Sequence, residues 1–487
     1  MSLVVMTLGG TPVEDPAAIG RTAAIVAGRV AQGKQPVVVV SAMAKVTDQL
    51  LRAAAAAASG DRTGALAISS RLRSRHRDTA CTLLKNPADS AALQILIDQK
   101  FDSLDEILRG LAAILELTPR ISDLIVSYGE RISSRIVAAA FLECGLNAAH
   151  VDARDVIVTD SQFQKAAPQD TLIEKRAHEH LRPHIDAGRV PVMGGFIASN
   201  EAGITTTLGR GGSDFTGALV GGALSADAIE IWTDVDGIMT ADPRVCPDAL
   251  RVRTISFEEA AELAYFGAKV LHPATILPAV KKNIPVYVLN SRNAACEGTR
   301  ITSLAPPCGS PFKSIAVKKK LSIIDVVASR MLMTHGYMKE IFTIFDKHQC
   351  PVDMVSTSEV SVSLSVDSND KLPAIAADLS QLADVKYEGR KALVCLVGDD
   401  IRGRSGMAAQ VFTAVRHINV RMISQGASEI NMSFMIDEDD ADEAVRSLHA
   451  AFFQNPDPTV FDVEARKPLP DDRLQMTGDS KSPAVKV

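Results

Sequence analysis

The start of the chain alternates unbroken apolar runs with a segment of helical periodicity. Residues 3–6 and 36–41 are continuous apolar runs, which is typical of strands buried on both faces of a parallel sheet. Between them, residues 17–30 repeat apolar positions at helical spacing, and Asp15 followed by Pro16 is a typical N-cap and first-turn pair. A strand, a helix and a strand in this order predict a right-handed crossover within an α/β sheet.

The next stretch of the chain is mostly helical by the same criterion. Apolar positions recur at helical spacing through residues 48–145. Further buried strands are predicted at 190–193, 228–232 and 286–289. We therefore expect residues 1–302 to form one large α/β domain, with a mostly parallel sheet flanked by helices.

The pattern of apolar and polar positions changes after a turn-rich linker at residues 303–312, which contains three prolines and a glycine. Short alternating strands and amphipathic helices follow, and they contain an internal repeat. The segment 358–364 is matched by 428–434, and Gly336 is matched by Gly406, both at an offset of 70 residues. Two aligned features at one offset predict a duplication. We expect two β-α-β-β-α-β units, at 313–388 and 389–466, followed by a polar, disordered tail at 467–487.

Bulk composition excludes several classes of function. The chain of 487 residues is 46% apolar and 23% charged, with a net charge of −6. That balance offers no broad basic surface for nucleic acid. The seven cysteines are scattered and lack CxxC spacing, which argues against a disulfide framework or a zinc site. No apolar run approaches the roughly 18 residues of a membrane helix, so we expect a cytoplasmic protein without a membrane partner.

The densest group of candidate binding residues is the stretch 205–214, Thr-Thr-Thr-Leu-Gly-Arg-Gly-Gly-Ser-Asp. Glycines let a backbone approach a phosphate and turn its N–H groups toward it. Arg210 adds a planar fork for a carboxylate or a phosphate. Ser213 and Asp214 stand where a helix over 215–224 is expected to begin, and a helix N-terminus favours an anion. The alternative interpretation is a glycine-rich turn without a ligand.

Three further stretches carry candidate chemistry, and each has a plain structural alternative. The segment 232–244 follows a predicted strand, and Asp234 or Asp236 could help to hold Mg²⁺ while Arg244 meets phosphate; Asp-Gly and Asp-Pro pairs are also ordinary turn formers. Lys269 is either a nucleotide contact or a solvated lysine. Glu130 is either a capping charge at a helix start or the partner of an ammonium group.

Together with residues 8–11 and 41–47, these stretches closely resemble the aspartokinase family, in the same order along residues 3 to about 460. The repeated C-terminal units resemble the ACT domains of that family. The resemblance implies an amino-acid-kinase fold followed by two ACT domains. It also implies a reaction: the β-carboxylate of L-aspartate attacks the γ-phosphorus of MgATP and gives 4-phospho-L-aspartate, the entry to lysine, threonine and methionine synthesis. Other amino-acid kinases share the sheet but lack this combination.

The resemblance also assigns roles. Aspartate would be held by Ser41, Thr47, Glu130 and Arg210, and the phosphoryl end would be organised by Gly10, Arg210, Ser213 and Asp214. ATP would be surrounded by Thr7, Gly9, Gly10, Thr11, Thr233, Asp234, Met239, Arg244 and Lys269. No motif binds a metal directly, and Mg²⁺ would arrive with ATP. A carboxylate with a pKa of about 4 is already ionised at pH 7 and needs no general base, so catalysis reduces to positioning and charge stabilisation.

The sequence departs from the family at the first strand. The family motif is Lys-Phe-Gly-Gly-Thr-Ser, whereas this chain has Thr7-Leu8-Gly9-Gly10-Thr11-Pro12. Threonine offers one neutral hydrogen bond where lysine offers a charge, and Pro12 removes a backbone N–H. Met239 also stands where a tyrosine is expected. Three explanations remain open: a slow or inactive paralogue, substitution by another lysine such as Lys45, or a variant or error in this stretch.

The regulatory half resembles the lysine pocket of lysine-inhibited aspartokinases. A strand-to-helix turn offers N–H groups to an effector carboxylate, and Asp353 and Glu359 could pair with its ammonium groups. On this resemblance, lysine binds between the first ACT domains of two subunits of a dimer or tetramer. The alternative is that the apolar residues fill a core and the acids are solvated. The expected contacts are Met331, Thr334, Tyr337, Met338, Val352, Asp353, Ser358 and Glu359.

Two other functions stay open at this point. Thr7 favours a catalytically silent lysine sensor that works through its ACT domains. A kinase for another small carboxylate is the third interpretation.

Overall fold

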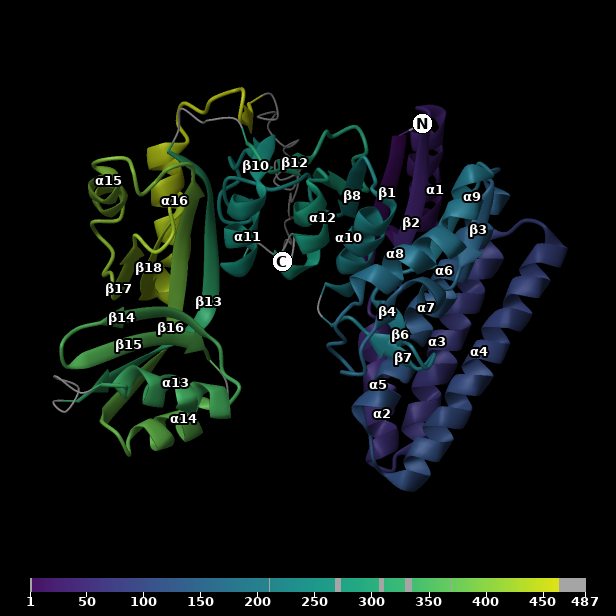
Figure 1. Ribbon diagram of the computed structural model, residues 1–487, viewed down its shortest axis with the longest axis horizontal. Helices are drawn as coiled ribbons and strands as arrows, with labels where there is room; N and C mark the ends of the chain where they lie inside the picture. Colours follow the sequence, from purple (N-terminus) through teal and green to yellow (C-terminus); the bar gives the residue numbers. More distant parts are fainter. Residues whose placement is uncertain are drawn as a thin grey trace, which may run out of the picture.

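The computed structural model describes residues 2–209, 211–267, 273–305, 311–328, 335–368 and 370–463. The kinase half and the regulatory half lie side by side and meet around helix α11 (Phe257–Tyr265) (Figure 1). The chain returns to the kinase half near its end, because β19 (Phe461–Asp462) pairs with β9 (Arg251–Val252). Along the described residues, no helix is both long enough and apolar enough to cross a membrane.

The kinase half is built on an eight-stranded sheet with the order β10-β12-β11-β8-β1-β2-β5-β3. Neighbouring strands are parallel, except that β11 and β12 are antiparallel. The mostly parallel α/β sheet expected from the apolar runs is therefore confirmed. Its strands are β1 (Ser2–Leu8), β2 (Lys34–Val40), β3 (Ala148–Val151), β5 (Val190–Gly194), β8 (Ala228–Thr233), β10 (Thr254–Ser256), β11 (Val286–Asn290) and β12 (Thr299–Thr302).

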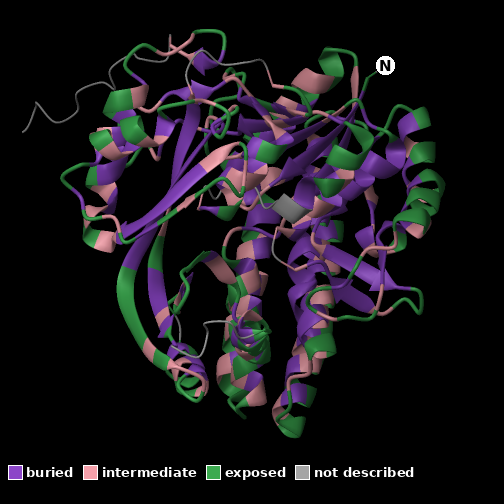
Figure 2. Cartoon of the chain, turned by 60° about the vertical axis from the view of Figure 1, so that its left-hand side comes forward, coloured by how far each residue is buried: buried purple, intermediate pink, exposed green. Residues whose placement is uncertain are grey.

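Helices cover both faces of this sheet, and the alternation along β1 shows why. Val4 and Met6 belong to the apolar core under one helical layer, whereas Leu3 and Val5 belong to the core under the other. A strand buried on both sides must be apolar at every position, and Figure 2 shows buried strands between helices with exposed outer faces. The first layer contains α1 (Pro16–Ala31), α2 (Val46–Ala58), α3 (Arg62–Leu83), α4 (Pro87–Ile114), α5 (Pro119–Val126) and α6 (Tyr128–Glu143). The second contains α7 (Ala153–Val156), α8 (Asp170–His180), α9 (Arg182–Asp186), α10 (Gly212–Leu224), α11 and α12 (Leu277–Lys282).

Local sequence signals set several helix ends. Asp15 caps α1 by accepting a hydrogen bond from the Ala18 N–H at 2.7 Å, with Pro16 at the first helical position. Helix α10 begins at Gly212, three residues earlier than expected, because Gly211 takes a left-handed conformation with φ of 71° and caps it. A small sheet of β4 (Val158–Thr159), β6 (Ile197–Asn200) and β7 (Thr205–Thr207) carries the chain into that turn.

The regulatory half is a six-stranded antiparallel sheet with the order β14-β15-β13-β16-β18-β17. The predicted repeat is visible in its elements: β15 and β18 begin 70 residues apart, and so do α13 and α15, each after a glycine with positive φ (Gly336, 84°; Gly406, 79°). Helix α15 ends at Ala414, shorter than its counterpart. The elements are β13 (Phe312–Val327), α13 (Tyr337–Lys347), β14 (Val352–Thr357), β15 (Ser361–Asp367), α14 (Leu372–Leu379), β16 (Asp384–Gly398), α15 (Met407–Ala414), β17 (Met422–Gln425), β18 (Asn431–Asp437) and α16 (Ala441–Phe452).

The two regulatory units share their longest strands, which the repeat did not predict. The second half of β13 pairs with β15 and with the first half of β16, and these strands belong to the first unit. The first half of β13 pairs instead with the second half of β16, beside β18, in the second unit. The second unit therefore includes the first half of β13, a strand segment that precedes the first unit in the sequence. A 16-residue strand spans roughly 50 Å, enough to cross both units.

Candidate active site

The expected binding loops meet at the carboxyl edge of four neighbouring strands. The loops are interlocked by backbone hydrogen bonds: the Gly9 N–H donates to the Trp232 carbonyl at 3.3 Å, and the Ser41 N–H donates to the Leu8 carbonyl at 2.9 Å. The Gly195 N–H donates to the Val40 carbonyl at 2.8 Å. Ligands of open parallel sheets bind at this edge. The structure thus brings together the segments around Gly9, Ser41, Gly195 and Thr233.

Glu130 is a buried carboxylate at this edge of the sheet. Its Oε1 accepts a hydrogen bond from the Ala42 N–H at 3.2 Å, whereas its Oε2 is buried and has no partner in the part of the chain that the structure describes. Burial raises the pKa of Glu130 to about 8, against the lowering effect of the Ala42 hydrogen bond. A buried acid with an unpartnered oxygen is suited to a cationic ligand.

The position of Glu130 depends on close backbone packing. A Cβ atom on Gly194 would lie 3.1 Å from the Glu130 Cβ, and one on Gly129 would lie 2.8 Å from the Ala42 Cβ. Both contacts are tighter than side chains ordinarily make. The glycines therefore let helix α6 approach the ends of β2 and β5.

Ser41 and Ser213 face each other across the site. The Ser41 hydroxyl donates to Ser213 Oγ at 2.8 Å, and the Ser41 carbonyl accepts from the Ser133 hydroxyl at 2.5 Å. A Cβ on Gly195 would lie 2.7 Å from Ser213 Cα, so the glycine loop packs directly on the first turn of α10. Ser133 was not predicted, since a serine inside a helix carries no sequence signal for this role.

Thr7, which replaces the lysine of the family motif, is buried and contacts Asp214. The Thr7 hydroxyl donates to Asp214 Oδ1 at 3.0 Å. Burial raises the pKa of Asp214 to about 6, and the Thr7 hydrogen bond opposes that rise only in part. A Cβ on Gly217 would lie 2.1 Å from Thr7 Cγ2, so helix α10 lies directly against this side chain. Asp214 therefore has a neutral partner where the family motif would give it a cation.

The glycine-rich stretch is held by a buried acid that sequence analysis missed. Asp123, on α5, accepts hydrogen bonds from the Thr207 N–H at 3.0 Å, the Thr207 hydroxyl at 2.8 Å and the Gln164 N–H at 2.9 Å. Burial raises its pKa, and these hydrogen bonds lower it. Gly209 and Gly211 take positive φ of 78° and 71°, a conformation that favours glycine over residues with a side chain. Arg210 lies outside the described residues.

The expected nucleotide residues after β8 are only partly assembled. The Thr233 hydroxyl donates to Asp234 at 3.3 Å, and Asp234 is exposed at the end of the strand. Asp236 instead accepts from the Asn290 amide at 2.9 Å, which holds the turn. The guanidinium of Arg244 is 88% exposed and paired with Asp242 at 2.6 Å.

The remaining predicted residues lie in several places. Gly10 and Thr11 follow β1, and Thr47 lies in the first turn of α2. Met239 lies beside β13, where its carbonyl accepts a hydrogen bond from the Ser314 hydroxyl at 2.7 Å. Lys45 is exposed and stands at the N-cap position of α2 with a φ of 66°, without a side-chain capping hydrogen bond. Lys269 lies outside the described residues.

Arg75 is a second residue that sequence analysis missed. Its guanidinium donates to the Ala44 carbonyl at 2.7 Å and to the Glu14 carbonyl at 2.8 Å. It thereby ties the loop after β1 to the loop after β2. An arginine on a polar helix face gives no sequence signal of such a contact.

Comparison with known proteins identifies the family of the chain. Residues 2–290 match the model of the amino acid kinase family, and residues 324–377 and 394–452 match that of an ACT domain. Lysine-sensitive aspartokinase 3 of Escherichia coli K12 is 35% identical over 462 residues, which cover 93% of this chain and 99% of that protein. The chain belongs to the aspartokinase family. Like its relatives, it is an aspartate kinase with ACT domains, and the expected family and fold are confirmed.

Other aspartokinases agree with this assignment. Chloroplastic aspartokinase 2 of Arabidopsis thaliana is 34% identical over 467 residues, covering 92% of this chain and 84% of that protein. The crystal structure of E. coli aspartokinase III with aspartate and ADP, in the R-state, has a TM-score of 0.81 at 35% identity and covers 93% of this chain and 100% of that one. The same enzyme with lysine and aspartate, in the T-state, has a TM-score of 0.79 at 35% identity and the same coverage.

The predicted effector residues of this aspartokinase are spread over the first ACT unit. Tyr337 is buried at the start of α13, with Met338 and Val352 packed at the edge of the same core. Ser358 and Glu359 lie in the turn between β14 and β15. Met331 and Thr334 lie outside the described residues.

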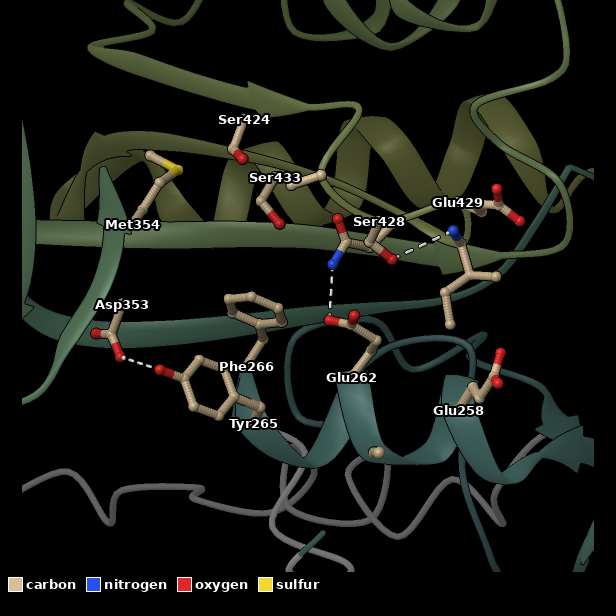
Figure 3. Close-up of a pocket in the computed structure, with 14 residues that line it drawn as sticks. Glu258, Glu262, Tyr265, Phe266, Asp353, Met354, Ser424, Ser428, Glu429 and Ser433 are labelled. Atoms are coloured by element: carbon tan, nitrogen blue, oxygen red, sulfur yellow. Dashed lines mark hydrogen bonds between the residues drawn. The ribbon is translucent and has the colours of Figure 1, made fainter. Parts of the chain in front are cut away.

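Asp353 already has partners within the chain. Lys318 Nζ lies 2.8 Å from Asp353 Oδ2. The Tyr265 hydroxyl donates to Asp353 Oδ1 at 3.2 Å, as Figure 3 shows. Asp353 lines a cavity of about 720 Å³ between α11 and the regulatory sheet. Here the Asn431 amide also donates to Glu262 at 2.6 Å. Asp353 therefore connects the regulatory sheet to the helix that precedes residues 268–272.

Proposed function

We propose that this chain transfers the γ-phosphoryl group of MgATP to the β-carboxylate of L-aspartate, giving 4-phospho-L-aspartate, and that lysine inhibits it. The observation that carries the proposal is Glu130, a buried carboxylate at the carboxyl edge of the sheet with one oxygen that has no partner among the described residues. An α-ammonium group would donate a hydrogen bond to that oxygen, and its positive charge would balance the buried carboxylate. Aspartate held there would direct its other end toward Ser41 and Ser213.

The residues at the edge fit a magnesium nucleotide. Gly9 leaves the space between the β1 loop and the end of β8 free of a side chain. Asp234 offers an exposed carboxylate at the end of β8. Magnesium bound to a nucleotide keeps most of its ligands as water and phosphate oxygens, and needs one or two carboxylates. The described residues hold no group of three or more His, Cys, Asp or Glu side chains that could hold a metal ion. Magnesium would neutralise phosphate charge when bound.

The protein's own contribution is positioning. The nucleophile is a carboxylate that is ionised at neutral pH, so no base has to remove a proton from it. The difficulty is the repulsion between that carboxylate and the triphosphate, which positioned N–H groups and cations reduce. The glycine turn held by Asp123 and the first turn of α10 would supply N–H groups, and Arg210 would supply the charge.

A second candidate function rests on Thr7. At the end of β1 the Thr7 hydroxyl contacts Asp214 of α10, whose pKa burial raises to about 6, where the family motif presents an ammonium. That observation favours a lysine-binding protein with very slow catalysis.

A coupled assay of ADP release separates these functions. We expect ADP release that depends on aspartate, because the Glu130 site and the nucleotide edge lie on the same row of strand ends. Release with another small carboxylate in place of aspartate would assign a different substrate. No release with either, together with heat on titration with lysine, would establish the sensor.

Lysine inhibition is the regulatory part of the proposal. It is supported by the relative described as lysine-sensitive and by the relative's structure with lysine. ACT units of this kind would associate between subunits of a homo-oligomer, and an effector bound there would act on α11 through Asp353. Lys318 competes for that carboxylate within the chain.

Two substitutions at this pair are expected to have opposite effects. Asp353→Asn should raise the lysine concentration for half-inhibition at least ~10-fold, because a charge partner of the effector ammonium is lost. Lys318→Met should lower that concentration, because it frees Asp353. The measurement is the inhibition curve at fixed aspartate, with Glu340→Gln, an exposed acid on α13, as the control. A calorimetric signal with threonine and none with lysine would contradict the choice of effector.

A further inference from the structure

A cluster of basic side chains lies beyond the Glu130 site, at the far end of the same sheet edge. Lys100 comes from α4, and Arg131 and Arg135 come from α6. With His150 and Asp152, at the end of β3, they surround a cavity with an accessible volume of about 20 Å³. This is space for about one water molecule or one ligand oxygen. We call Lys100, Arg131 and Arg135 the α4–α6 basic cluster.

The acid beside the cluster is already neutralised by another arginine. Asp152 pairs with Arg154 through two hydrogen bonds, of 2.6 Å and 3.0 Å, and caps α7 through the Arg154 N–H at 3.1 Å. Burial raises the pKa of Asp152, but the hydrogen bonds and charge of Arg154 outweigh it and bring the pKa down to about 2. Asp152 is therefore paired most closely with Arg154, and its charge also acts on Lys100 and Arg131. With Arg154 included, four cations face this one carboxylate.

His150 does not supply a charge of either sign at neutral pH. Burial, with the charge of Arg135 close by, lowers its pKa to about 4. Its Nε2 lies 3.1 Å from the Ser134 hydroxyl. Ser134 and neutral His150 are thus polar groups that can donate or accept a hydrogen bond at the cavity.

The three cations of the cluster lack a carboxylate within ion-pair distance among the residues that the structure describes. Burial and the nearby guanidinium groups of Arg131, Arg154 and Arg135 lower the pKa of Lys100. Arg131 lies over the Tyr128 ring at 4.6 Å, which fixes its guanidinium at the cavity. Like charges at such close range, partly shielded from water, repel one another unless an anion is present.

We propose that the α4–α6 basic cluster binds a phosphate group. Two planar guanidinium forks and an ammonium match the oxygens of a tetrahedral oxyanion, and three positive charges suit a dianion better than a single carboxylate. The group is either free orthophosphate or the phosphate of a small metabolite. Its oxygen enters the cavity, and its remaining atoms face the solvent around the exposed Arg135.

The cluster adjoins the expected aspartate site through Gly194. Gly194 lines the cavity, and on its other side it packs against Glu130, where an added Cβ would lie 3.2 Å from the Glu130 carbonyl oxygen. A phosphate group bound to Arg131 holds the first turn of α6 and this glycine together. We expect phosphate to lower the apparent KM for aspartate; this second readout rests on the proposed function.

The primary test does not depend on activity. Thermal unfolding of the full chain is measured with saturating MgADP, which occupies the nucleotide site, while inorganic phosphate is titrated against chloride at equal ionic strength. We expect phosphate to raise Tm by at least about 2 °C more than chloride. The double variant Arg131→Gln/Arg135→Gln should lose that shift, and without phosphate its Tm should equal or exceed the parent's because repulsion is relieved. Arg109→Gln, an exposed arginine on the same α4 helix, should keep the shift.

Two outcomes would overturn the proposal: a phosphate shift no larger than that of chloride, or a shift that persists in the double variant. If the double variant does not fold, inorganic phosphate is titrated by calorimetry into the parent and into Lys100→Gln. Binding that is absent from the parent, or unchanged in Lys100→Gln, would overturn the proposal. Tighter binding of O-phosphoserine than of orthophosphate, lost in the variant, would identify a phosphorylated metabolite as the source. Equal or weaker binding would identify the free ion.

Discussion

Replacing Thr7 by lysine is expected to raise the turnover number at least ~10-fold, because a fixed cation at the transferring phosphoryl group stabilises its charge far better than a hydroxyl does. The Thr7 hydroxyl lies 3.0 Å from Asp214 Oδ1, so the longer side chain would pass Asp214 and gain an ionic partner. The ammonium would in turn lower the pKa of Asp214 from about 6. The measurement is kcat from aspartate-dependent ADP release.

A matched variant separates charge from size. Thr7→Met introduces a side chain of similar length without charge, and it should not raise kcat. Asp214→Asn in the Thr7→Lys background should remove part of the gain, because the ammonium loses its orienting partner. Equal turnover in the parent and in Thr7→Lys would show that this chain does not use a cation at position 7.

Glu130→Gln is expected to lower kcat/KM for aspartate by roughly 10²–10⁴, since removing one partner of a desolvated charge pair costs about 3–5 kcal/mol. Most of the loss should appear in KM, because the ammonium of aspartate takes no part in the phosphoryl transfer. Glu130→Asp, which keeps the charge but shortens the side chain, is the control and should lose less. Steady-state kinetics at saturating ATP provides the measurement, and an unchanged KM in Glu130→Gln would remove Glu130 from the aspartate site.

The raised pKa of Glu130 gives this site a pH dependence with a definite sign. With a pKa of about 8 in the free protein, Glu130 is mostly protonated at pH 7 and must lose its proton to pair with an ammonium. The Kd for aspartate should therefore rise about tenfold for each pH unit below 8, and binding at pH 7 should release a proton. Calorimetry in buffers of different ionisation enthalpy measures that release. Glu130→Gln should bind without it.

The same shift predicts how stability changes with pH. The folded pKa of about 8 lies above the ordinary value of 4.5, so between these values the folded protein holds a proton that the unfolded chain has lost. The contribution of Glu130 to the free energy of unfolding therefore falls as pH rises through this window. Glu130→Gln should gain stability relative to the parent on going from pH 5 to pH 8.

Much of the fold could be predicted from the sequence because its signals are local. Continuous apolar runs identify strands covered on both faces, and Asp15 with Pro16 marks a helix start that the structure confirms. The offset of 70 residues predicts the regulatory duplication, since each copy needs its own glycine and its own strand alternation. The same holds for those parts of the candidate site in which glycines and charged residues stand within a few positions of one another, such as the stretch 205–214.

What the sequence by itself determined is the set of elements, the repeat and the family motifs, including the missing lysine at position 7. The tertiary structure alone decided that Thr7 contacts Asp214, that one oxygen of Glu130 is buried without a partner among the described residues, and that Lys318 neutralises Asp353. It also decided that β13 serves both regulatory units. The reason is that burial, ion pairing and pKa depend on which distant segments meet, whereas periodicity and capping depend on neighbours along the chain.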